Sequence, residues 1–284
     1  MGRICAPFFY DPMDFPCILE VRALIPFDRR ALLKSLAAAP FAAIQRTEAD
    51  TTRWEKAARF DHGVASGDPA VDSVVIWTRV SGLDDALEVQ WELATDTAFK
   101  QKVATGTVWT SAHRDFTVKA VPNGLAPGQR YFYRFKAGDS VSVMGRTRTL
   151  PVGSLQSLGI AVASCSNFAF GYFNAYDAIA HDKGIEFVLH LGDYIYEYGV
   201  DGWGAEVADS LGRRHEPGHE IVSLQDYRQR HAQYKTDAGS QAMHAAHPLL
   251  MVWDDHESAS NPWVGGAQNH QTHTEGLWRD RRAA

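Results

Sequence analysis

The sequence has few cysteines, no excess of positive charge and no long apolar segment. Cys5 and Cys17 lie near the start and Cys165 stands alone in the rest, so disulfide bonds cannot hold the main part of the chain together. A net charge of −6 gives no bulk basic field that would attract nucleic acid. No apolar run is long enough to cross a bilayer, so we expect no transmembrane segment.

Aromatic residues are abundant, with eight tryptophans and ten tyrosines. This composition fits a protein that contains β-sheets better than a purely helical one. Hydrophobic residues make up 45% and charged residues 22% of the sequence, which are ordinary values for a globular protein. A length of 284 residues is enough for one large domain or two modest ones.

The segment 1–59 predicts an export signal followed by a linker. Arg29 and Arg30 precede a short, weakly apolar run and then small residues, an order that resembles a twin-arginine signal. Such a signal implies recognition by the twin-arginine export machinery and a periplasmic or extracellular location. The alternative is an amphipathic helix that begins at Asp28. Because 28 residues precede the arginine pair, we also hypothesise that the true start lies near Val21.

The segment 60–150 predicts a β-sandwich domain. Short stretches of β-branched and aromatic residues alternate with turn signals. Their regular spacing favours a sandwich of the immunoglobulin or fibronectin type. None of its residue sets indicates catalysis, so we expect this domain to pack against the one that follows. The predicted strands are 73–80, 87–93, 116–121 and 130–135.

The segment 151–284 has a different pattern, in which apolar strands alternate with helices. A buried strand at 158–163, a helix at 176–181 and a second strand at 187–191 form a βαβ unit. Its two strands should therefore be parallel neighbours. A third buried strand is predicted at 248–253.

Potential metal ligands follow each of these three strands. Cys165 follows the first, Asp193 and Tyr196 follow the second, and Asp255 and His256 follow the third. Because ligands in open α/β sheets bind at the carboxyl ends of the strands, we expect these side chains to converge. A phenolate beside a carboxylate suits a hard, highly charged cation such as ferric iron.

Each candidate also has a purely structural interpretation. Asp193 would cap a helix, Cys165 would be an inert buried thiol, and Asp255 would belong to the salt-bridged start of a helix. His190 lies within a strand and is predicted to be a buried, hydrogen-bonded core residue rather than a ligand. Five other histidines of this segment are interpreted as surface residues: His215, His219, His231, His244 and His247.

Several runs resemble the alkaline phosphatase D (PhoD-like) family of metallophosphoesterases. The resemblance covers roughly 60–284 and implies a β-sandwich followed by an α/β metallophosphoesterase (αββα) domain, a multidomain α+β fold. Members of this family usually carry a twin-arginine signal. The matching runs are 62–69, 75–79, 163–165, 190–198, 252–257 and 265–270.

The resemblance also implies roles for individual residues. Cys165, Asp193 and Tyr196 would bind ferric iron (Fe3+). Asp193 would bridge to a calcium ion (Ca2+) that Asp255 also holds. His256 would steady the phosphate, which makes Asp255 and His256 the catalytic pair. The cations would activate a water molecule for attack on phosphate mono- or diesters outside the cytoplasm.

The sequence stops at the opening of a predicted helix in 278–284. Only three strands of the metallophosphoesterase sheet precede that point, and the family's remaining His and Asp ligands come from a later half. We therefore expect a truncated member with an incomplete metal site, open sheet edges and an uncovered apolar face. The alternative is an inactive fragment, or a β-sandwich that acts as a non-catalytic binding module.

Overall fold

A computed structural model describes residues 58–284 of the chain. These residues belong to one compact unit, Thr47–Ala284. The predicted export signal, with Cys5 and Cys17, lies outside the described residues. Within the described part, no helix is both long enough and apolar enough to cross a membrane.

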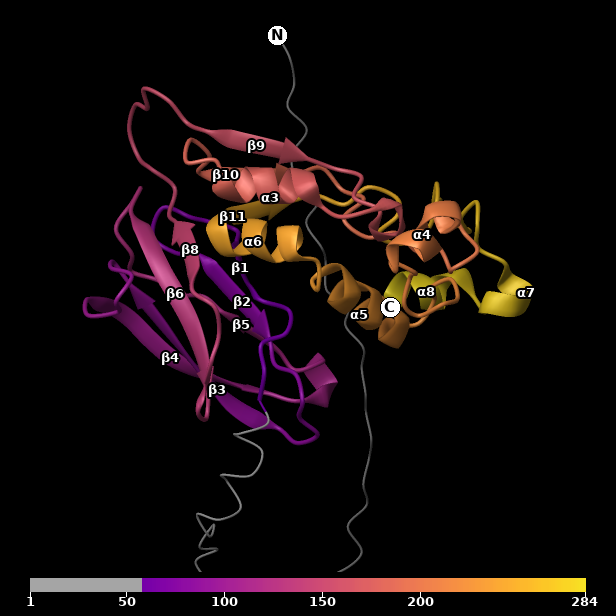
Figure 1. Cartoon of the computed structure of the whole chain (residues 1–284), viewed down its shortest axis with the longest axis horizontal. Helices are drawn as coiled ribbons and strands as arrows, with labels where there is room; N and C mark the ends of the chain where they lie inside the picture. Colours follow the sequence, from indigo (N-terminus) through magenta and orange to yellow (C-terminus); the bar gives the residue numbers. More distant parts are fainter. Residues whose placement is uncertain (1–57) are drawn as a thin grey trace, which may run out of the picture. The chain divides into compact units, whose positions relative to one another are not determined.

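A six-stranded mixed sheet forms the centre of this unit (Figure 1). Its strand order is β5-β2-β1-β11-β10-β9. The pairs β9–β10, β10–β11 and β11–β1 are parallel, whereas β1–β2 and β2–β5 are antiparallel. The strands are β1 (Val64–Gly67), β2 (Val75–Arg79), β5 (Thr117–Ala120), β9 (Ile160–Ala163), β10 (Phe187–His190) and β11 (Pro248–Met251).

A second, five-stranded sheet is antiparallel throughout, in the order β4-β3-β6-β7 with β8 paired to β6. In β3, Leu87 and Val89 are buried while Glu88 and Gln90 are exposed, the alternation that a half-buried strand requires. The strands are β3 (Leu87–Ala94), β4 (Lys102–Thr110), β6 (Arg130–Ala137), β7 (Ser140–Val141) and β8 (Gly145–Arg148).

The helices lie mainly after β9. The best-defined start is that of α5, where Ser223 accepts a hydrogen bond from the Asp226 N–H and the Asp226 carboxylate accepts one from the Ser223 N–H. This reciprocal capping box defines the first turn of the helix. The helices are η2 (Ala112–Arg114), η3 (Phe168–Phe170), α3 (Asn174–His181), α4 (Ala205–Leu211), α5 (Leu224–Tyr234), α6 (Ala238–Ala246), α7 (Thr272–Glu275) and α8 (Trp278–Ala283).

The α+β class is confirmed, but the β-sandwich does not form a pair of sheets of its own. Three of its strands, β1, β2 and β5, continue into the sheet that contains β9 to β11. The connection is the parallel pairing of Ser66 with Pro248 and of Gly67 with Leu249. Such pairing between distant segments leaves no local sequence signal. The domain boundary near residue 150 stays a prediction.

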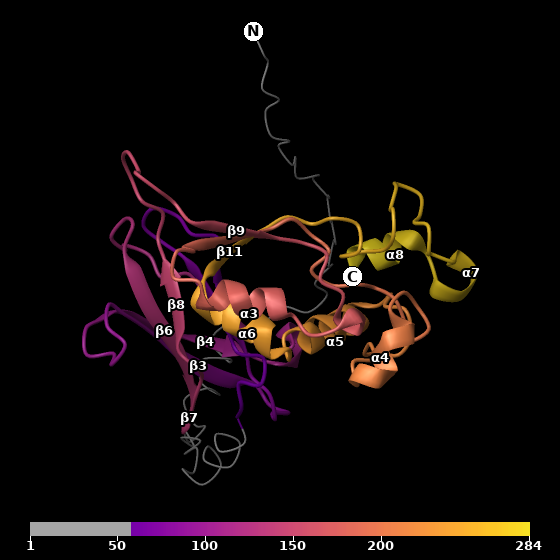
Figure 2. The ribbon, with the colours of Figure 1, turned by 45° about the horizontal axis from the view of Figure 1, so that its top comes forward.

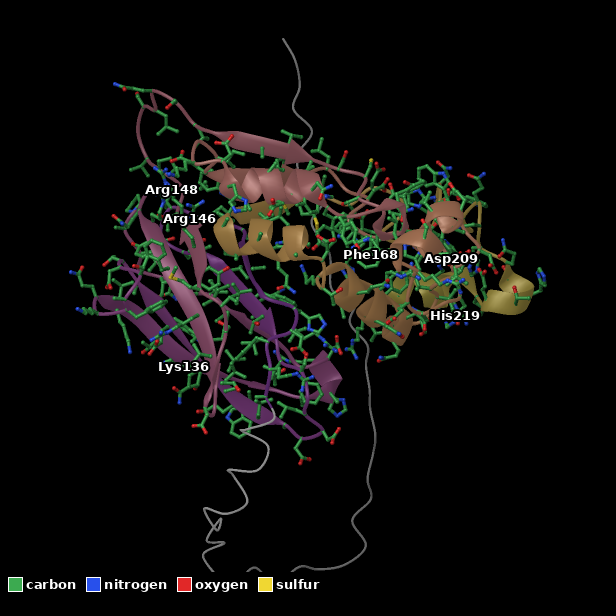
Figure 3. The ribbon with its side chains drawn as sticks, viewed as in Figure 1. Lys136, Arg146, Arg148, Phe168, Asp209 and His219 are labelled. Atoms are coloured by element: carbon green, nitrogen blue, oxygen red, sulfur yellow. The ribbon has the colours of Figure 1, made fainter. Side chains whose placement is uncertain are left out.

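Two apolar cores hold the sheets in place. The first fills the space between the two sheets and combines side chains such as Val64 and Ile76 with Leu87 and Phe135. Toward the helices, Arg146 of β8 donates to the Ala246 carbonyl at the end of α6 (2.9 Å), and Arg148 pairs with Glu186 (Figure 3).

The second core lies between the parallel strands and the helices α3, α5 and α6. In Figure 2 α3 and α6 run side by side beneath β9 and β11. On the edge strand β9, Ile160 and Val162 are 49% and 61% exposed. Within the described residues, β9 is therefore an edge strand with exposed apolar side chains, and the expected truncation stays a prediction.

Candidate metal centre

Three of the predicted site residues converge where β10 and β11 end. Asp193, Asp255 and His256 each offer one ligand atom, and these atoms lie within 4.8 Å of one another. Among residues 58–284 this is the one group of three His, Cys, Asp or Glu side chains close enough to hold a metal ion. The convergence follows from the parallel pairing of β10 with β11, which delivers both loops to the same edge.

Gly192 allows the two loops to touch. It has φ +100°, and a Cβ atom at this position would collide with the backbone of Asp254. The next residue, Asp193, also has a positive φ of 52°. A non-glycine residue in the left-handed region is strained, and such strain is concentrated at functional sites.

Glu257 joins the two loops through backbone hydrogen bonds. Its carboxylate accepts the N–H groups of Asp193 (3.1 Å) and Tyr194 (2.6 Å) from one loop. From its own loop it accepts the N–H of Asp254 (2.9 Å). Glu257 therefore fixes the backbone that carries the ligands. Sequence reasoning missed this role, because nothing in the run 252–257 marks the glutamate as an acceptor for a distant loop.

A second glutamate, Glu197, positions His256. Glu197 is fully buried, and its carboxylate lies 2.7 Å from Nδ1 of His256. It also accepts the Ser260 N–H and the Asn269 amide, both at 2.7 Å. Burial alone would lower the pKa of His256, but the hydrogen bond and negative charge of Glu197 outweigh it, with Asp255 and Asp193 adding to the effect. The pKa of His256 is therefore raised above its usual value, which favours the charged imidazolium.

Tyr196 lies directly against the cluster. Its hydroxyl donates to Asp193 Oδ2 (3.1 Å), and its ring stacks on His256 with centroids 4.4 Å apart. Burial and the negative charge of Asp193 raise the pKa of Tyr196. The phenol therefore stays protonated unless a cation takes the place of its proton.

Cys165 lies beside the cluster but outside the group of three. Its backbone N–H donates to the Gly192 carbonyl (3.2 Å), so the loop after β9 runs next to the loop after β10. The thiol is exposed, so the alternative of a buried inert thiol is wrong. Cys165 and Tyr196 line the same cavity of about 650 Å³. Its role as an iron ligand stays a prediction.

The structural alternatives for the two acids are not supported by the backbone. Neither Asp193 nor Asp255 precedes a helix; the chain after Asp255 forms turns. The Asp193 carboxylate accepts from the Tyr196 hydroxyl and, at 3.3 Å, from the His256 N–H. The Asp255 carboxylate accepts the Asn261 N–H (2.6 Å). Both acids therefore serve the loops at the cluster.

The predictions for the other histidines divide. His190 is fully buried and its Nε2 lies 2.7 Å from the Tyr176 hydroxyl, which confirms it as a core residue. His219 is exposed as predicted. His215, His244 and His247 are buried, so their assignment to the surface was wrong. Each has a hydrogen-bonding partner that makes burial tolerable: Tyr234, Tyr194 and the Ile179 carbonyl, respectively. His231 is half-buried.

The donors in this cluster fit a hard cation. Two carboxylates are typical ligands of divalent and trivalent metal ions, and the Tyr196 phenol adds a further oxygen within hydrogen-bonding distance of Asp193. Charge also favours a cation, because like-charged carboxylates held this close repel each other unless a positive charge lies between them.

Two family models match the chain. The model of the PhoD-like phosphatase covers residues 160–284. The model of the N-terminal domain of PhoD-like phosphatases covers residues 45–151. Together they cover both the five-stranded sheet and the loops that carry the cluster.

Individual relatives agree with the family models. Alkaline phosphatase D of Bacillus subtilis (strain 168) is 42% identical over 212 residues, which are 71% of this chain and 36% of that protein. A solved structure described as the structure of PhoD matches with a TM-score of 0.71 and 40% identity, and covers 79% of this chain and 44% of that one. The chain thus spans less than half the length of these relatives. On this evidence, the chain belongs to the PhoD-like phosphatase family.

Proposed function

We propose that the chain takes part in metal-dependent hydrolysis of phosphate mono- or diesters, as an alkaline phosphatase or phosphodiesterase of the D type. The observation that carries this proposal is the convergence of Asp193, Asp255 and His256 at the ends of two parallel strands. The family resemblance supplies the reaction class. A hydrolase of this class needs positive charge at the phosphate, and the cluster offers a place to hold it.

Asp193 and Asp255 are proposed to hold the cations, with Tyr196 and Cys165 as further ligands. By family resemblance the cations are Fe3+ and Ca2+. When bound, they would neutralise the charge of the phosphate oxygens and lower the pKa of a water molecule. Glu257 keeps both loops in register, so that the two acids stay close enough to share one ion.

His256 is proposed to steady the phosphate. Its raised pKa favours an imidazolium that can donate to an anionic oxygen through the nitrogen that Glu197 does not occupy. Glu197 holds the His256 ring at Nδ1, and the Tyr196 ring stacks on the His256 ring. The chain's own residues would thus bind and orient the ester before attack.

Metal content is the first test. Purified chain incubated with iron and calcium should retain metal after gel filtration, measured by elemental analysis, and the double variant D193N/D255N should retain little. Asp177→Asn, on the exposed face of α3, is the matched control and should retain as much metal as the wild type. Equal metal in the wild type and the double variant would overturn the cluster as a metal site.

Activity and colour separate the remaining roles. The loaded chain should hydrolyse a chromogenic phosphodiester and show a visible charge-transfer band from tyrosinate or thiolate bound to iron. Tyr196→Phe and Cys165→Ser assign that band to one ligand or the other. Metal binding without hydrolysis of the ester would support the metal site but contradict the catalytic proposal. That outcome is the one that the alternative of an inactive fragment predicts.

We also propose that the chain is exported. The support is the order of paired arginines, weakly apolar residues and small residues in 28–43, a segment outside the described residues. Replacing Arg29 and Arg30 by lysine in a fusion to a reporter that folds in the cytoplasm should block export. Continued export of the double-lysine variant would contradict a twin-arginine signal.

A further inference from the structure

A cleft of about 710 Å³ lies apart from the ligand atoms of the metal cluster. One wall comes from β2 and the loop around η2, and the other comes from α5 and α8. Trp253 and Glu257, from the loop after β11, also line it. Neither the family models nor the resemblance gives this cleft a role.

The cleft is strongly cationic although the chain as a whole is acidic. Two side-chain carboxylates line it, Asp115 and Glu257, together with the last residue, Ala284. Arg79 already pairs with Asp115 through two hydrogen bonds of 2.9 and 2.8 Å. The Glu257 carboxylate accepts hydrogen bonds from three backbone N–H groups and pairs with none of the cations in the cleft. The lysine and arginine side chains that line the cleft are Arg79, Arg114, Arg228, Lys235, Arg281 and Arg282.

Four of these cations have no carboxylate partner within the described part of the chain. Arg114 and Arg282 are exposed. Arg228 donates to the His113 carbonyl (2.8 Å), which joins α5 to η2 but leaves its charge uncompensated. Lys235 is the fourth. Uncompensated cations gathered in one cleft produce a local positive potential that attracts an anionic ligand.

Lys235 is the most informative of the four. Its Nζ lies 5.0 Å from the ring centroids of both Trp77 and Tyr194 and donates to the Tyr194 hydroxyl (3.0 Å). It is half-buried between these rings. A partly desolvated ammonium without a counter-charge is unfavourable, so an anion bound in the cleft would stabilise it.

An exposed aromatic ring completes the cleft. Trp253 is 77% exposed, which is unusual for so large an apolar side chain. Its indole offers a flat face to a planar ring, and stacking of this kind tolerates many ring types. The combination of unpaired cations with an exposed tryptophan suits a ligand that joins a phosphate to a planar ring.

We propose that this cleft binds a nucleoside monophosphate, with the phosphate at Lys235 and Arg228 and the base on Trp253. Arg114 would contribute to the positive potential at the phosphate. The proposal does not depend on hydrolysis or on a bound metal. The site shares Glu257 with the metal cluster, since Glu257 lines the cleft and also accepts the Asp193 N–H.

Binding is tested with adenosine monophosphate on the full chain in EDTA, in the D193N/D255N background, so that the metal cluster cannot contribute. Titration calorimetry should give saturable binding, and tryptophan fluorescence should change. Lys235→Met should weaken binding by about tenfold, as expected for loss of one charge-assisted hydrogen bond. Lys183→Met, an exposed lysine outside the cleft, is the control and should leave binding unchanged.

Two further variants distinguish the contribution of the phosphate to binding from that of the base. Arg114→Gln changes an exposed side chain, so folding is preserved, and should weaken adenosine monophosphate by about threefold. Trp253→Leu should weaken it by about fivefold or more through lost stacking, without weakening ribose 5-phosphate. Trp109→Leu, on another exposed tryptophan in β4, is the matched control.

Three results would overturn the proposal. The first is that adenosine monophosphate fails to bind below millimolar concentrations. The second is that either ribose 5-phosphate or adenosine binds as tightly as the nucleotide. The third is that neither Lys235→Met nor Arg114→Gln would weaken binding. The proposed metal site fails on a separate observation, equal metal retention by the wild type and by D193N/D255N, so the two failures are distinguishable.

Discussion

The core between the two sheets and the loops after β10 and β11 are held together by different forces. The core is built from fully buried apolar side chains such as Leu93, Val118 and Phe135. The loops are held by two carboxylates, Glu197 and Glu257, which accept hydrogen bonds from backbone and side-chain N–H groups. The core is therefore stabilised by the apolar area that it buries, whereas the loops are stabilised by directed hydrogen bonds.

This difference predicts how each region responds to change. Apolar burial is roughly proportional to area, so its loss should lower the stability of the whole unit. A carboxylate that accepts hydrogen bonds from several N–H groups stabilises only its own surroundings. Its removal leaves those donors without partners. We therefore expect global effects from the core and local effects from the loops.

The largest effect is expected from Phe135→Ala. Phe135 is fully buried and packs edge-on against Tyr133, with ring centroids 6.2 Å apart. The lost contacts and the cavity should lower the free energy of unfolding by about 4 kcal/mol, measured by urea titration. Val103→Ala, at a half-exposed position of β4, is the control and should change little. An unfolding free energy close to the wild type would contradict the role assigned to this core.

A smaller and more local effect is expected from Glu257→Ala. Removing the carboxylate leaves the N–H groups of Asp193, Tyr194 and Asp254 without their acceptor, at a cost of about 3 kcal/mol. Amide hydrogen exchange at Tyr194 should accelerate while exchange in β3 stays slow. Glu257→Gln keeps one carbonyl acceptor and should give an intermediate result. If exchange accelerated equally in β3, the distinction between the two regions would be wrong.

The smallest effect concerns charge on the outer face of the five-stranded sheet, where Lys136 lies (Figure 3). Glu92 accepts hydrogen bonds from Lys102 (2.6 Å), Arg134 (2.7 Å) and Lys136 (2.9 Å). Burial alone would raise the pKa of Glu92. The three cations outweigh that effect and lower the pKa from 4.5 to about 2. The carboxylate therefore stabilises the folded state wherever it is ionised.

The pH dependence follows from the direction of that shift. Because the folded pKa lies below the unfolded value of 4.5, the contribution is complete above pH 4.5 and disappears as the pH falls toward 2. Glu92→Gln should cost about 2 kcal/mol at pH 7. Urea titrations of the wild type and variant should converge at the acidic end of that range. A difference that stays constant with pH would show that the ion cluster does not contribute.

Much of the fold could be predicted because it depends on local patterns. The alternation in β3, the apolar runs of β10 and β11 and the capping box at Ser223 all act within a few residues. The pairing of β1 with β11 could not be predicted, because it joins segments at opposite ends of the described chain. Helix α6 was missed as well, since most of its apolar residues are alanines, which mark a buried face only weakly.

The cluster was predictable for a related reason. Strand ends can be located from sequence, and parallel strands bring their ends together, so Asp193, Asp255 and His256 could be placed in one site. Glu197 and Glu257 could not, because their function depends on which distant N–H groups they meet. The buried His244 was misassigned for the same reason: its partner, Tyr194, comes from another element.

The place of β11 between β1 and β10 has a consequence for biosynthesis. As the chain leaves the ribosome, β1 can pair with β2, and β9 with β10, long before β11 has been translated. Until then, each of the two partial sheets leaves unpaired the edge that β11 will later cover, at β1 in one and at β10 in the other. Strand β11, which precedes Asp255, is inserted between these two partial sheets. The loops that carry Asp193 and Asp255 can meet only after that insertion.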